Sequence, residues 1–186
     1  MALPAYSELR ALSNFTFLTG ASWPEELVDR ARELGYSAIA VVDECTMAGV
    51  VRAHTAAKEA GLKLLVGSQF KVRADLPFDM VVLAQTLNGY GNLCEFITHL
   101  RRAAEKGTYE LHRVAIDGGA LTDCVVLLLP ARTATDVQLE EFGRWALRHF
   151  TGRAWIGVDM NRRIDDELWL FRMRALGEAE TETLKA

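Results

Sequence analysis

The stretch from Ala38 to Val50, AIAVVDECTMAGV, constrains the fold of this chain more than any other. Its first five residues are apolar with a β-branched bias, and they run directly into Asp43 and Glu44. A continuous apolar run that ends in carboxylates predicts a buried parallel strand that carries acids to its C-terminal end. Ligands and metals bind at that end of the strands in parallel α/β folds. The stretch therefore predicts both a fold class and a place to look for chemistry.

Strands and helices are predicted to alternate along the rest of the chain. The predicted strands are 8–12, 38–42, 63–66, 80–84, 124–129 and 154–158, and the predicted helices are 24–34, 48–60, 88–106, 135–150 and 165–176. A further extended piece at 69–72 either pairs with the strand at 63–66 or continues it. Ser22, Asn88 and Asp165 are predicted to cap their helices, and residues 107–122 to contain one short strand. Such an alternation predicts βαβ units and an α/β fold with a mainly parallel sheet.

The composition fits one soluble globular domain with its own core. Of the 186 residues, 50% are hydrophobic and 25% are charged, and a chain of this size buries about 70% of its unfolded surface. The formal net charge of −4 argues against a basic nucleic-acid-binding surface acting alone. Cys45, Cys94 and Cys124 lie far apart and outside any CxxC spacing, so we expect reduced thiols. Because no apolar segment nears 18 residues, we expect a cytoplasmic location.

Three segments of the chain resemble one protein family. They are LSNFTFLTGAS at 12–22, ELGYSAIAVVDECTMAGVVRAHTAAKEAGLKLLVGSQF at 33–70 and VVLAQTLNGYGNLCEFITHLRRA at 81–103. Together they are similar to the N-terminal polymerase-and-histidinol-phosphatase (PHP) domain of bacterial C-family DNA polymerases. Within that family they are most similar to the error-prone, damage-tolerance branch. The resemblance covers about residues 6–178.

The resemblance implies a distorted (β/α)7 barrel of the PHP type. We expect an incomplete, TIM-like barrel over residues 1–178, followed by a polar tail, 179–186, with no counterpart in the family. In active members, His, Asp and Glu side chains hold a cluster of metals at the C-terminal rim for phosphoester hydrolysis or proofreading. In other members the metal site has decayed and the domain stabilises the polymerase. An incomplete barrel leaves an unpaired edge strand, which favours association.

The resemblance also implies where the metal ligands of the family fall in this sequence. Histidines of the family correspond to Arg10, Leu12, Glu44 and a position near Asp79, a glutamate corresponds to Gln69, and an aspartate is kept as Asp43. A zinc site needs three or four converging ligands, and a multi-metal phosphoesterase site needs more. Only Asp43, Glu44 and Asp79 remain as metal candidates, which predicts a degenerate site.

Each candidate side chain also has a structural interpretation. Asp43 could cap the following helix or pair with a basic side chain, and Cys45 is expected to be buried rather than nucleophilic. The pair Arg101–Arg102, with Lys106, could contact DNA or a polymerase, but a solvated helix face accounts for it equally simply. Structural or solvated positions are predicted for His54, His99, His112 and His149.

The function predicted from the resemblance is that of a PHP-domain fragment of an error-prone DNA polymerase of translesion synthesis. It would act as a scaffold without polymerase activity of its own, because the catalytic aspartates of the family lie far beyond residue 186. One alternative is a residual phosphoesterase or 3′–5′ exonuclease that uses Asp43, Glu44 and Asp79 with Zn, Mn or Mg. Another alternative is a free-standing protein-interaction module.

The expected partners follow from the same resemblance. They are the remainder of a C-family polymerase or accessory proteins of damage tolerance, with DNA contacted only indirectly and no membrane. No cofactor is expected unless the metal site is residually active, in which case it would hold a divalent metal.

Overall fold

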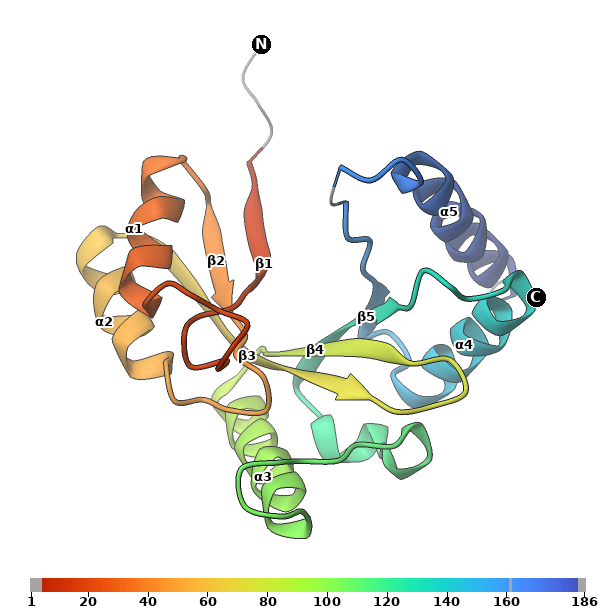
Figure 1. Cartoon of the computed structure of the whole chain (residues 1–186), viewed down its shortest axis with the longest axis horizontal. Helices are drawn as coiled ribbons and strands as arrows, with labels where there is room; N and C mark the ends of the chain where they lie inside the picture. Colours follow the sequence, from red (N-terminus) through yellow and green to blue (C-terminus); the bar gives the residue numbers. More distant parts are fainter. Residues whose placement is uncertain (1–4, 161, 184–186) are drawn as a thin grey trace.

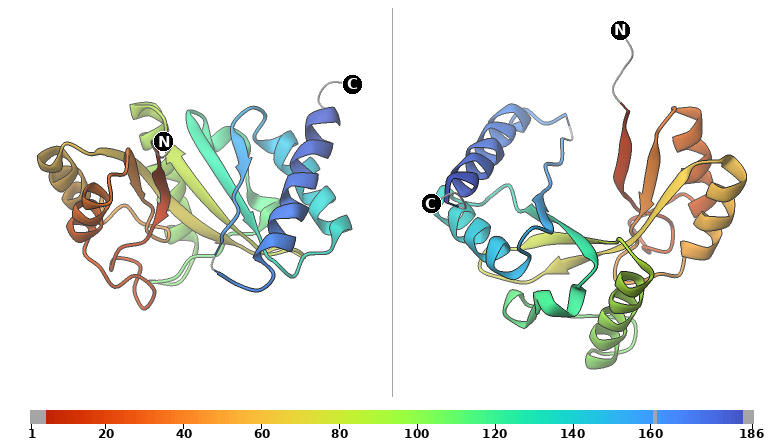
Figure 2. Two further views of the ribbon diagram at one scale, coloured as in Figure 1. Left: turned by 90° about the horizontal axis from the view of Figure 1, so that it is seen from above. Right: turned by 180° about the vertical axis from the view of Figure 1, so that it is seen from behind.

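Six strands form one sheet in the order of the sequence, and the helices cover its outer, convex face (Figures 1 and 2). The computed structural model describes residues 5–160 and 162–183. The elements are β1 (Ser7–Ala11), α1 (Pro24–Glu33), β2 (Ala38–Val41), α2 (Val50–Ala60), β3 (Lys63–Val72), β4 (Phe78–Ala84), α3 (Leu87–Ala103), the 3-10 turns η1 (Arg113–Ala115) and η2 (Gly118–Leu121), β5 (Cys124–Pro130), α4 (Asp136–His149), β6 (Ala154–Ile156) and α5 (Asp166–Thr183).

The sheet curls into an incomplete barrel with mainly parallel strands, which confirms the predicted α/β fold class. The pairings β1–β2, β2–β3 and β5–β6 are parallel. Strand β4, however, is antiparallel to both β3 and β5, which departs from the βαβ pattern that the alternation of elements predicts. The reason is the short connection at 73–77, because a parallel crossover needs a dozen or more residues and usually a helix.

Strand β3 is continuous, so the piece predicted at 69–72 continues the strand predicted at 63–66 rather than pairing with it. Its first part pairs with β2 up to Val66, and from Gly67 onward it pairs with β4. A Cβ at Gly67 would lie 2.4 Å from the carbonyl oxygen of Val82, so only glycine lets the strands approach this closely. The change of partner at Gly67 joins the two halves of the curled sheet.

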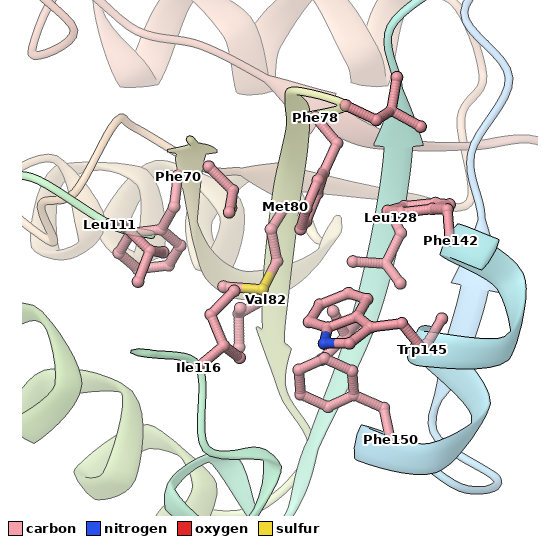
Figure 3. Close-up of a cluster of buried hydrophobic side chains, with 14 of the residues drawn as sticks. Phe70, Phe78, Met80, Val82, Leu111, Ile116, Leu128, Phe142, Trp145 and Phe150 are labelled. Carbon is pink, nitrogen blue, oxygen red and sulfur yellow. The ribbon is translucent and has the colours of Figure 1, made fainter. Parts of the chain in front are cut away.

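The main core lies between the outer face of β3, β4 and β5 and the helices that cover it. In Figure 3, Leu128 of β5 lies beside Phe142 and Trp145 of α4, whereas Met80 of β4 points toward Ile116, and all five are buried. A smaller cluster that includes Val28 packs α1 and α2 against β2. The helices therefore bury the convex face and leave the concave face for other contacts.

Several predicted details of the helices are wrong. Trp23, not Ser22, is the N-cap residue of α1, and its N–H donates to Glu26. Thr86, not Asn88, caps α3, because its hydroxyl oxygen accepts a hydrogen bond from the backbone N–H of Gly89.

Two further corrections concern the connection at 107–122 and the end of the chain. The connection contains the turns η1 and η2 rather than a strand. Helix α5 continues to Thr183 instead of ending at Leu176, since the Glu and Ala of the polar tail are good helix formers. Residues 184–186 of the predicted tail lie outside the described residues. No helix in the described part of the chain is long and apolar enough to cross a membrane.

Candidate functional site

The candidate residues gather at one rim of the curled sheet, on its concave side. Side chains alternate between the faces of a strand. Because Phe70 and Met80 belong to the outer core, their neighbours Gln69 and Asp79 project to the concave face. Asp79 stands at the start of β4, yet it reaches the rim where the parallel strands end, because β4 runs antiparallel to them. The rim borders a cleft of about 730 Å³ that includes Glu44 and Asp79 in its lining.

Arg10 lies at the centre of this rim, and all three of its guanidinium nitrogens are bound. Nε donates to Oε1 of Gln69 at 3.0 Å, and Nη1 donates to Oδ2 of Asp159 at 2.5 Å. Nη2 donates to Oδ2 of Asp79. The fork of the guanidinium thus brings together side chains from β3, β4 and the segment after β6. A permanent positive charge occupies the space toward which these three side chains converge.

Asp43 is buried and fully engaged by the loop that follows β1. Oδ1 accepts hydrogen bonds from the backbone N–H of Ser13 at 2.8 Å and from the hydroxyl of Thr16 at 2.7 Å. Oδ2 accepts from the Ser13 hydroxyl at 2.6 Å. The side chain is only 3% exposed, so its carboxylate serves to hold the loop rather than to face the rim.

Glu44 makes a different set of contacts. Its carboxylate accepts a hydrogen bond from the Tyr109 hydroxyl at 2.9 Å and pairs with Nζ of Lys71 at 3.1 Å. Burial raises the pKa of Tyr109, and the neighbouring negative charge of Glu44 raises it further. The phenol therefore keeps its proton at neutral pH and remains the donor to Glu44.

Cys45 is buried, as the sequence predicts. Its side chain is 0% exposed, and burial raises the pKa of the thiol to about 11. Arg101 donates to the carbonyl oxygens of Cys45 and Glu44 at 3.1 and 3.3 Å, so it supports this loop from α3. Arg102 is exposed on that helix, and Lys106 is exposed in the turn that follows it.

The histidines do not contribute to the rim. His54, His99 and His112 are exposed, and His149 places Nδ1 3.0 Å from the carbonyl oxygen of Trp145 within α4. Leu12, at the other predicted first-strand position, packs with Val42 and Leu83 in an apolar cluster.

These residues do not fit a divalent metal. Among residues 5–160 and 162–183, no group of three or more His, Cys, Asp or Glu side chains could hold a metal ion. Asp43, Glu44 and Asp79 each face a different set of donors, and Arg10 supplies the positive charge next to Asp79. The structure joins the side chains of Arg10, Gln69 and Asp79. Asp43 and Glu44 lie beside Gln69 through backbone pairing, but their carboxylates are bound elsewhere.

A second arginine holds the segment that carries Asp159. Arg132, in the loop after β5, donates to the backbone carbonyl of Asp159 and to Oδ1 of Asp166, the latter at 2.5 Å. Burial alone raises the pKa of Asp166, but hydrogen bonds from Arg132 and from the N–H of Arg163, together with the charge of Arg132, outweigh it and hold that pKa below its usual value.

Sequence reasoning did not assign functional roles to Asp159, Arg132 and Tyr109. The only sequence feature that pointed to Asp159 was its position just after an apolar strand. Arg132 and Tyr109 lie in loops without a recognisable pattern.

A family model named PHP domain matches residues 8–128 of the chain. The chain belongs to the PHP family. A crystal structure of a protein from Bifidobacterium adolescentis, provisionally named a metal-dependent phosphoesterase, has the same fold, with a TM-score of 0.67 at 15% identity. The match covers 94% of this PHP chain and 85% of that protein.

Two curated relatives of this PHP chain are error-prone DNA polymerases. The one from Dechloromonas aromatica is 47% identical over 182 residues, and the one from Methylococcus capsulatus is 49% identical over 173 residues. These matches cover 96% and 93% of this chain. The chain spans only 17% and 16% of the length of these relatives.

We predict that Asp43→Ala destabilises the protein strongly. It removes the acceptor of three hydrogen bonds inside the protein, and each buried donor left unpaired costs about 1–3 kcal/mol. The free energy of unfolding, measured by urea denaturation, should therefore fall by at least about 3 kcal/mol. Asp29→Ala, on the exposed side of α1, is the matched control and should change it by no more than about 0.5 kcal/mol. Equal stability of the two variants would contradict the structural role of Asp43.

A second prediction concerns pH and the Arg132–Asp166 contact. Because the pKa of Asp166 is lowered in the folded protein, its stabilising effect is present above the usual aspartate pKa of about 4 and is lost as pH falls through the lowered value. Asp166→Asn should therefore be less stable than the wild type at pH 7, and the difference should shrink at pH values below about 4. Thermal unfolding at a series of pH values measures this, and a difference independent of pH would contradict it.

Proposed function

We propose that this chain is the PHP domain of an error-prone DNA polymerase and that it supports the polymerase structurally rather than hydrolysing phosphoesters. The relatives from Dechloromonas aromatica and Methylococcus capsulatus, with 47% and 49% identity, support the link to that class of polymerase. The observation that carries the structural role is the Arg10 guanidinium at the centre of the rim.

Metal-dependent phosphoester hydrolysis needs a cation that is open to the substrate and to an attacking water. In this chain the rim carboxylates of Asp79 and Asp159 are already paired with Arg10, whose guanidinium cannot coordinate a water or a substrate oxygen as a metal ion does. Glu44 is directed to Tyr109 and Lys71 instead. The contacts at the rim are therefore those of a structural ion-pair network.

The partner in this proposal is the remainder of an error-prone DNA polymerase, acting in damage tolerance. The relatives are about six times as long as this chain, in keeping with its 16–17% share of their length. A domain that contributes surface and stability to such a protein needs no chemistry of its own. DNA would then be bound by other parts of the polymerase.

The absence of hydrolysis can be tested directly on the purified chain. We expect less than one equivalent of zinc or manganese to remain bound after dialysis, and no turnover of p-nitrophenyl phosphate or single-stranded DNA above that of the Asp79→Asn variant. Metal content by mass spectrometry and product release measure these. A stoichiometric metal together with turnover that Asp79→Asn abolishes would overturn the proposal and favour the residual phosphoesterase.

The scaffold role predicts a stable complex with the rest of a polymerase. The error-prone polymerase of Dechloromonas aromatica can be expressed without the segment that this chain matches, and the chain can be supplied separately. We expect the two to elute together on size-exclusion chromatography and the polymerase part to gain solubility. Asp29→Ala, an exposed substitution on α1, serves as the control variant and should bind equally well. Failure of the chain to co-elute with the polymerase part would contradict the scaffold role.

A further inference from the structure

The curled sheet has two edges, β1 and β6, and they flank the same open side of the molecule (Figures 1 and 2). A groove of about 1180 Å³ lies along this side, lined by residues 6–10 of one edge and 155–159 of the other. The floor of the groove is apolar and includes Leu65 and Leu127. Within the described chain, no strand pairing joins β1 to β6.

The contact between Arg10 and Asp159 bridges these two edges. Arg10 belongs to β1, and Asp159 follows β6 by three residues. The two side chains are 149 positions apart in sequence, yet Nη1 and Oδ2 lie 2.5 Å apart. The same guanidinium reaches Gln69 in β3 and Asp79 in β4, so both edges are tied to the middle of the sheet.

We propose that the Arg10 guanidinium takes the place of a metal ion as the cation that holds the two edges of the open sheet together. Two carboxylates, from Asp79 and Asp159, face one positive charge. Without that charge they would repel each other across the rim, and β1 would lose its link to Asp159. Arginine suits this position because it stays charged and its planar fork serves several acceptors at once. We call this set of four residues, Arg10, Gln69, Asp79 and Asp159, the arginine clasp.

The clasp is partly exposed to solvent, and this limits its strength. The side chain of Arg10 is 22% exposed, while those of Asp79 and Asp159 are 32% and 45% exposed. Exposed pairs contribute little, whereas breaking a buried pair costs far more. We therefore expect that loss of Arg10 lowers the stability of the fold by more than loss of a fully exposed ion pair and by less than loss of a buried one.

The test is the stability of the full chain after substitution of Arg10. For Arg10→Ala we expect the unfolding equilibrium constant to rise at least about tenfold, and for Arg10→Lys, which keeps the charge but loses the fork, a smaller rise. The control is Arg30→Ala, whose ion pair with Glu33 is exposed on both sides and which should change the constant by no more than about threefold. Equal behaviour of Arg10→Ala and Arg30→Ala would overturn the clasp.

A double-mutant cycle tests whether the loss of stability arises from the contact between Arg10 and Asp159. Arg10→Ala, Asp159→Asn and the double variant are compared by urea denaturation, and we expect the two substitutions to be coupled by at least about threefold in the unfolding constant. Hydrogen exchange should accelerate in β1 and at residues 157–160. Independent effects of the two substitutions would overturn the bridge between the edges. If Arg10→Ala fails to fold, Arg10→Lys replaces it in the cycle.

The need for a positive charge between Asp79 and Asp159 can be tested by adding a divalent cation. Manganese binds carboxylate oxygens, so at millimolar concentration it should stabilise Arg10→Ala more than the wild type, in which Arg10 already neutralises Asp79 and Asp159. The thermal midpoint with and without manganese measures this. An equal effect on both proteins would contradict the replacement of a metal charge. These outcomes do not depend on the proposed role in a polymerase, because a free-standing domain would need the same clasp.

Discussion

A single positive charge, the guanidinium of Arg10, lies where the edges and the middle of the curled sheet meet. It contacts Gln69 of β3, Asp79 of β4 and Asp159 beyond β6. The rest of the rim is arranged around this constraint. Two carboxylates can lie close together on the concave side of an apolar sheet only because one cation serves both.

The two acids that follow β2 make separate sets of contacts. Asp43 is held by Ser13 and Thr16, and it fixes the loop after β1. Glu44 turns to Tyr109 and Lys71. Adjacent residues on an extended segment point apart, so this pair does not form a joint site. An acidic strand end is therefore compatible with a metal centre and equally with a purely structural network, and the neighbouring side chains decide between them.

The sequence predicted the elements and the fold class well, because strand and helix periodicities are local properties. It also indicated a degenerate metal site, since Arg10 and Leu12 stand where the resemblance implies histidines. It missed the antiparallel direction of β4, although the five-residue connection before that strand was a usable signal. The caps at Trp23 and Thr86 were missed because several polar residues near each helix start compete for that role.

The sequence by itself therefore determined the succession of strands and helices and the family, and it predicted a degenerate metal site from the residues at the ligand positions that the resemblance implies. Only the tertiary structure decided which side chains surround Arg10 at the rim. The contact of Arg10 with Asp159 joins residues 149 positions apart, and it exists because the curl of the sheet brings its two edges to one rim. No local pattern encodes such a contact, because the curl depends on the change of partner at Gly67 and on the packing of helices over the whole convex face.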